Sequence, residues 1–149
     1  MVNIDAQLLA KLQLYLSHDQ DAIRFIKAFG SYCHEIDDII DEKITDPEKI
    51  LRTFVNAAAI YSCNFYQRFA DRLYPTVLLI TNEYADSVKW EKNDDSYKEH
   101  ISDVLRSCGN NMLILVVGIV AGYEAMRDVS CLIRETSYLK HHDELGKPV

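Results

Sequence analysis

One stretch of the chain carries a line of side chains suited to binding a cation. Residues 32–42 read YCHEIDDIIDE, and four of them are spaced i, i+3, i+4 and i+7: His34, Asp37, Asp38 and Asp41. That spacing places all four side chains on one face of a helix. Like charges so spaced destabilise a helix by roughly 0.2–0.5 kcal/mol per pair, and Lys43 is the nearest basic residue to relieve them. A divalent cation would relieve them more completely.

This acid stripe predicts a particular chemistry. Mg²⁺ or Mn²⁺ would be held by the carboxylates of Asp37, Asp38 and Asp41, and the cation would neutralise the oxygens of a phosphorylated small molecule of the diphosphate type. His34 or Glu35 would then orient or deprotonate a water molecule. The same pattern is also typical of a solvated surface, because the apolar residues of this helix centre roughly 150° away from the stripe.

A second group of acids follows further along the chain, where Glu83, Asp86 and Glu91 share the segment 75–91. Two acid-bearing helices that face one another are a common way for a bundle to hold metals. Glu83 and Asp86 are therefore candidate metal ligands that would complete the site formed by the first stripe. An exposed amphipathic face is the alternative interpretation.

Amides and one arginine are the candidates for contacts with a substrate. Asn56, Asn64 and Gln67 are expected on one face of a helix, where short amides are poor helix formers and indicate a partly closed cleft or hydrogen bonds between helices. Arg127 has the geometry to clamp a phosphate. An ion pair of Arg127 with Glu124 or Asp128 is the alternative.

Two enzyme families share parts of these patterns. The segment Asp37-Asp38-Ile39-Ile40-Asp41-Glu42 resembles the first aspartate-rich motif of isoprenoid synthases, and Glu83, Ser87 and Glu91 have the spacing of the second motif in terpene cyclases. The pairs Asp38/Asp41 and Glu83/Asp86 are similar to the helix-borne acid pairs of the all-α nucleoside triphosphate pyrophosphohydrolases. Both resemblances imply Mg²⁺ and a diphosphate. The spacing H-x-x-D-D-x-x-D is also similar to that of small phage-encoded helical proteins, which implies no mechanism.

The elements that must position these residues are all predicted to be helical. Ser17-His18-Asp19 and Thr45-Asp46-Pro47-Glu48 are typical helix boundaries, and Gly109 indicates a bend. Five helices are expected, over residues 4–15, 19–43, 45–73, 75–91 and 97–138. Short links between long helices favour antiparallel neighbours, so we expect an up-and-down helical bundle with the apolar C-terminal helix at its centre. One domain would span residues 1–139, followed by a flexible tail at 140–149.

The composition of the chain argues against some classes of partner and location. The chain has 149 residues and a net charge of −7 without a basic stripe, which argues against nucleic acid as a partner. The apolar run 112–122 is too short for a membrane span, and no signal peptide is visible, so a cytoplasmic protein is expected.

Four cysteines at wide intervals are expected to be buried thiols. No Gly-rich phosphate loop or nucleophilic triad is present, and the pair Gly118/Gly122 indicates close helix packing.

Two functions follow from these observations. The first is metal-dependent binding or hydrolysis of a phosphorylated small molecule through the acid stripe. The alternative is a non-enzymatic helical assembly or adaptor protein in which the stripe is solvated. A homo-oligomer, in particular a dimer, is expected in either case because amide-rich and apolar faces leave surface to bury. The two functions differ in whether the acid groups converge around one cleft.

Overall fold

The fold is all-α. The computed structural model describes residues 4–145, which form eight helices and no strand. Their bounds are α1 Ile4–Leu16, α2 Gln20–Asp41, α3 Pro47–Ser62, α4 Asn64–Arg68, α5 Ala70–Trp90, α6 Ser96–Arg106, α7 Asn110–Ala121 and α8 Tyr123–Leu145. The prediction of an all-α chain is confirmed, and the predicted number of five helices is wrong.

The first half of the chain begins its helices where the sequence indicates. The Asp19 side chain accepts a hydrogen bond from the Ala22 amide and caps α2. The Asp46 side chain accepts one from the Glu48 amide, and Pro47 occupies the first position of α3, where a missing amide hydrogen costs nothing. Both predicted boundaries are confirmed.

The predicted helix 45–73 is divided into three pieces, and Pro75 does not break the chain. Extended backbone at Cys63 ends α3, and Phe69 separates α4 from α5. Pro75 then lies inside α5, as its sixth residue. It is beyond the first four amides, so its missing amide hydrogen removes one backbone hydrogen bond that α5 would otherwise make.

The predicted C-terminal helix 97–138 is also three helices. The chain bends at residues 107–109, next to the predicted bend at Gly109. It then reverses direction at Gly122, whose φ is +92°. Gly118 is close to α8, since a Cβ there would lie 2.9 Å from the Met126 sulfur. Close helix packing is thus confirmed at Gly118, whereas Gly122 is needed for its backbone conformation. α8 continues to Leu145, so the predicted tail is helical as far as that residue.

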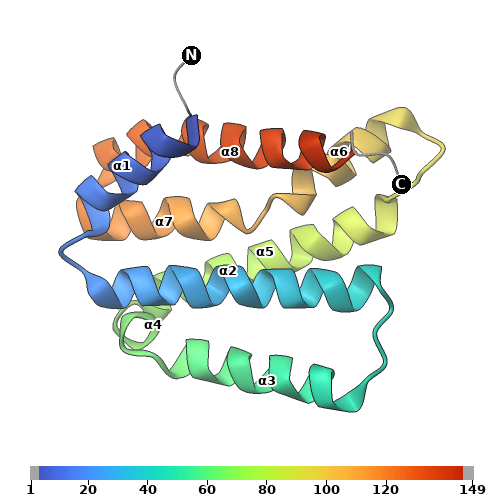
Figure 1. Cartoon of the computed structure of the whole chain (residues 1–149), viewed down its shortest axis with the longest axis horizontal. Helices are drawn as coiled ribbons and strands as arrows, with labels where there is room; N and C mark the ends of the chain where they lie inside the picture. Colours follow the sequence, from blue (N-terminus) through green and yellow to red (C-terminus); the bar gives the residue numbers. More distant parts are fainter. Residues whose placement is uncertain (1–3, 146–149) are drawn as a thin grey trace.

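α7 is the central helix, which agrees with its apolar sequence. Its residues Met112 and Val116 pack in a core with Phe25, Phe65 and Leu73, while other residues of α7 pack in a second core with α1 and α8. Figure 1 shows α7 between α8 and the layer formed by α2 and α5. A helix covered on several sides has no polar face, as the sequence of α7 requires.

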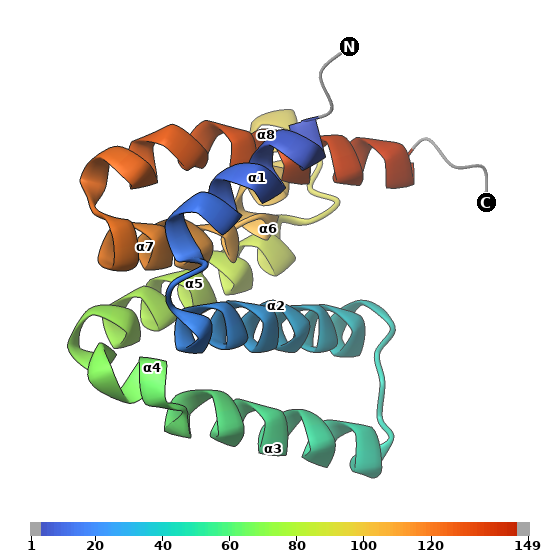
Figure 2. The same cartoon turned by 60° about the vertical axis from the view of Figure 1, so that its left-hand side comes forward.

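α3 lies at the edge of the molecule. Among the described helices it contacts only α2 and α4, whereas α7 contacts four others. Figure 2, turned by 60° from Figure 1, again shows α3 at the opposite end of the fold from α1 and α8. One side of α3 is therefore covered by α2 and the other is open.

No single helix within residues 4–145 is long and apolar enough to cross a membrane; α6 and α7 meet that criterion only as a pair bent by 43°.

Candidate functional site

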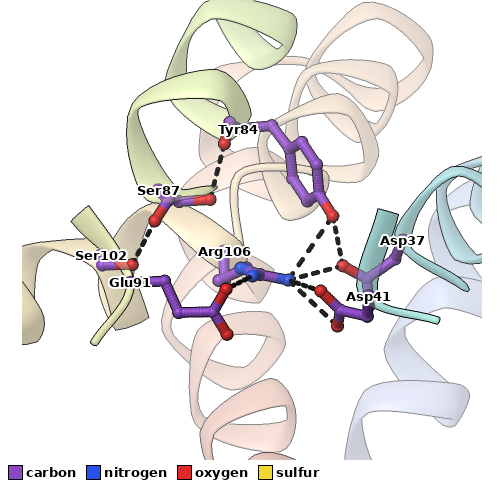
Figure 3. A network of polar contacts seen from close by, with 7 residues as sticks. All are labelled: Asp37, Asp41, Tyr84, Ser87, Glu91, Ser102 and Arg106. Atoms are coloured by element: carbon purple, nitrogen blue, oxygen red, sulfur yellow. Dashed lines mark hydrogen bonds and ion pairs between the residues drawn. The ribbon is translucent and has the colours of Figure 1, made fainter. Parts of the chain in front are cut away.

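The acid stripe of α2 meets an arginine that sequence reasoning missed. Arg106, the last residue of α6, donates from Nη1 to Asp37 at 2.8 Å and to Asp41 at 3.2 Å, and from Nη2 to Glu91, the residue after α5, at 2.8 Å. Figure 3 shows the guanidinium between the three carboxylates. We call these four residues the Arg106 cluster.

Tyr84 of α5 completes the contacts around the guanidinium. Its hydroxyl donates to Asp37 at 2.5 Å, and the guanidinium lies 5.3 Å from the centre of its ring. Burial raises the pKa of Tyr84 well above its usual value, and the hydrogen bond to Asp37 raises it further. The phenol therefore stays protonated and acts as a donor to Asp37 at all ordinary pH values.

Two buried serines fix the distance between α5 and α6 next to this cluster. The Ser102 hydroxyl donates to the Ser87 carbonyl, and the Ser87 hydroxyl donates to the Tyr84 carbonyl. Both serines are fully buried, and their small side chains let the two helices approach closely. Residues 87–106 thus form a hairpin of the end of α5 and α6 (Figure 1), which brings Arg106 to the side of α2.

The predicted metal ligands do not form a metal site in the described part of the chain. No group of three or more His, Cys, Asp or Glu side chains there is arranged to hold a metal ion. Asp37 and Asp41 are ion-paired with Arg106, and Asp38 is exposed. The residues present do not fit Mg²⁺ or Mn²⁺, because a guanidinium already provides the positive charge that these carboxylates need.

The second acid group meets the first, but through Glu91 and not through the predicted ligands Glu83 and Asp86. Glu91 meets Asp37 and Asp41 at Arg106, whereas Glu83 accepts a long hydrogen bond from Asn111 of α7 at 3.4 Å. Asp86 is half-buried beside it on α5. The expectation that the two acid segments face one another is correct for Glu91, while Glu83 pairs with an amide.

Glu35 and Asn56 form a separate polar contact between α2 and α3. The Asn56 side-chain nitrogen donates to both carboxylate oxygens of Glu35, at 2.9 and 3.1 Å. Two shallow hollows of about 330 and 370 Å³ lie between these helices on either side of Glu35. Asn56 thus makes the hydrogen bond between helices that was the alternative to substrate binding, and the carboxylate of Glu35 is occupied by this contact.

The remaining candidates are dispersed. His34 is exposed on α2, and Asn64 is exposed at the start of α4. Gln67 donates to the Tyr61 carbonyl at 2.7 Å. Arg127 is exposed and donates to the Ser130 hydroxyl at 3.3 Å, and neither of its two predicted acid partners is bonded to it. The structure does not bring these four residues to one place.

Asp128, one of the partners predicted for Arg127, pairs instead with α1. Its carboxylate accepts from Lys11 at 2.6 Å and from Tyr15 at 2.7 Å. The hydrogen bond from Lys11 holds the pKa of Asp128 below its usual value. This contact fastens α1 to α8, which is a structural role.

The cysteines are free, as expected, but not uniformly buried. Cys108 is buried, Cys33 and Cys63 are half-buried, and Cys131 is exposed. Burial raises the pKa of Cys33 to about 12 and that of Cys108 to about 11. The prediction of buried thiols is wrong for Cys131.

α3 presents an exposed apolar face. Leu51, Phe54 and Val55 are 63, 73 and 64% exposed, and the exposed Ala58 follows them at helical spacing. We call these four residues the outer stripe of α3. They lie opposite Thr53 and Ile60, which are buried towards α2. α3 is therefore packed on one side and exposes large apolar side chains on the other.

α5 also exposes large apolar side chains on one face: Tyr74, Leu78 and Leu79 are 55, 53 and 63% exposed. They share that face with the exposed polar residues Asp71 and Asn82. No polar residue lies between the four members of the outer stripe of α3, which is therefore the more continuous apolar surface.

Comparisons with models of known families, with curated proteins and with solved structures gave no match.

Proposed function

We propose that this chain is a non-enzymatic helical interaction protein, and that the outer stripe of α3 is the surface through which it binds another protein. The single observation that carries the proposal is the exposure of Leu51, Phe54 and Val55 on one face of a helix whose opposite face is already packed. Fully burying one such side chain contributes roughly 1.5–3 kcal/mol. Contiguous apolar surface of this kind is typical of binding sites.

The state of the acid residues supports the same proposal. Asp37, Asp41 and Glu91 converge, but they converge on Arg106, whose side chain is only 16% exposed. The two hollows described above lie elsewhere, between α2 and α3. An enzyme built on the acid stripe would need acids and a cleft in the same place.

Metal-dependent binding or hydrolysis of a phosphorylated small molecule stays a prediction from the sequence. The acid stripe favours it, while Asp37 and Asp41 are ion-paired with Arg106 and only the third aspartate of the stripe, Asp38, has no such ion pair. A metal would have to displace the guanidinium before it could bind both aspartates.

Photo-crosslinking tests the proposal. A benzophenone amino acid is placed at position 54 and, as a control, at position 14 of α1, where Leu14 is equally exposed. In the cells that naturally make the protein, illumination should give a discrete adduct from position 54 and none from position 14, and Leu51→Lys in the same chain should abolish it. No adduct from position 54 would contradict the proposal.

A further inference from the structure

We propose that the partner of α3 is a second copy of this chain, and that two α3 helices pair antiparallel across their outer stripes. This inference rests on the proposed function and names its occupant. Three features bear on such a pair: the sizes of the side chains in the stripe, the charges beside it and the area that the contact would bury.

The sizes of the side chains in the stripe are self-complementary. In a two-fold antiparallel pair centred between Phe54 and Val55, Leu51 of one copy lies opposite Ala58 of the other, and Phe54 lies opposite Val55. Each large side chain therefore meets a smaller one, which is the condition for side chains to interdigitate. A two-fold contact requires such matching of a surface with itself. In a parallel pair Leu51 would meet Leu51 and Ala58 would meet Ala58, which leaves one position crowded and the other empty.

The charges beside the stripe fit the same arrangement. Glu48 and Arg52 lie in the N-terminal half of α3 and form an ion pair with each other at 3.7 Å. The C-terminal half, residues 56–62, has no charged side chain. Antiparallel pairing places each charged half against the uncharged half of the other copy, so that no like charges meet. It also opposes the two helix dipoles, which is the favourable orientation.

The area available indicates a weak dimer. α3 has 16 residues and is the element that carries the contact, so the interface lies at the small end of specific interfaces, at about 1,200 Å² or less in total. We expect an interface of that size to bind weakly, with a Kd in the micromolar range or above. The chain should therefore exchange between monomer and dimer.

Sedimentation equilibrium measures this exchange directly. The wild-type protein should show a monomer–dimer equilibrium over a concentration series that brackets this Kd. Phe54→Lys should weaken it by at least about 30-fold, as expected for a central apolar contact. Leu14→Lys is the matched control, because Leu14 is 70% exposed but lies on α1, and it should leave the Kd unchanged. Circular dichroism should show the same helix content in all three proteins.

Exchanging the large and small side chains at positions 51 and 58 tests the antiparallel register. Ala58→Leu should weaken the dimer because two leucines then meet, and Leu51→Ala should weaken it because two alanines then meet. The double variant Leu51→Ala, Ala58→Leu should restore most of the affinity, because each leucine again faces an alanine. Alanine and leucine have similar helix propensity, so the monomer should not change.

Each outcome decides between the two proposals. If the wild-type chain is monomeric throughout while the crosslink from position 54 joins a different protein, the second copy is excluded and the proposed function stands. If the chain is monomeric and position 54 gives no adduct, both fail. If the chain dimerises but the double variant does not recover, antiparallel pairing of α3 is excluded.

Discussion

The Nη1 atom of Arg106 lies 2.8 Å from Oδ1 of Asp37, although 69 residues separate them along the chain. The same guanidinium also binds Asp41 and Glu91, so that one side chain joins α2, α5 and α6. It relieves the repulsion that the acid stripe of α2 would otherwise impose. The sequence suggested a metal for that purpose, and the fold provides an arginine.

Replacing Arg106 should destabilise the fold. Arg106→Met keeps the length of the side chain and leaves three carboxylates without their cation. We expect the free energy of unfolding to fall by about 1–2 kcal/mol, less than for a fully buried pair, because the carboxylate partners are 40–46% exposed. Urea denaturation measures the change.

The salt dependence of this variant separates charge from packing. Added NaCl should stabilise Arg106→Met, since it screens the remaining repulsion, and should slightly destabilise the wild type, since it screens an attraction. Arg24→Met is the control, because Arg24 pairs with Asp21 while 76% exposed and should cost less than about 0.5 kcal/mol. Equal salt responses in the wild type and Arg106→Met would mean that the cluster stabilises through packing alone.

Metal titration should give opposite results for the wild type and the arginine variant. Calorimetry of chelator-treated wild-type protein with Mg²⁺ or Mn²⁺, with and without pyrophosphate, should show no saturable binding, because Arg106 already neutralises Asp37 and Asp41. Arg106→Met should gain weak binding, since three carboxylates then surround a vacant position. Saturable binding by the wild type that Asp38→Ala, Asp41→Ala removes would favour the metal-dependent function instead.

Two glycines should respond to alanine with opposite signs. Gly122 has a φ of +92°, a conformation that strains any other residue, so Gly122→Ala should destabilise the fold by about 1–3 kcal/mol. Gly30 lies inside α2 with open space around it, so Gly30→Ala should stabilise by about 0.5–1 kcal/mol. Thermal unfolding of both variants checks the prediction, and a stable Gly122→Ala would show that the turn between α7 and α8 is not constrained.

The cysteines should differ in their reaction with iodoacetamide. The thiolate is the reactive form, and burial raises the pKa of Cys33 to about 12 and that of Cys108 to about 11. Both thiols should therefore remain protonated and unreactive in the folded protein at pH 9, while the exposed Cys131 is alkylated first. Peptide mass spectrometry gives the order. Rapid labelling of Cys33 without denaturant would show that α2 opens.

Local sequence signals predicted the elements that depend on local chemistry. Asp19 and Asp46 cap their helices through their own side chains, and the apolar segment of α7 is central because it has no polar face to expose. The divisions at Cys63, Phe69 and Gly122 were missed, because continued apolar periodicity is compatible with either one helix or two packed segments. The predicted helix boundary at residue 75 is also wrong, because α5 continues through Pro75 and loses only the backbone hydrogen bond that proline cannot donate.

The sequence by itself determined that the chain is helical, which residues line one face of each helix, and that α2 carries more negative charge than its own residues can neutralise. Only the tertiary structure decided how that charge is neutralised and which apolar face is left uncovered. The physical reason is the same in both cases. The reach of Arg106 to Asp37 and the exposure of Phe54 depend on how helices far apart in the sequence pack, and periodicity within one helix contains no information about its neighbours.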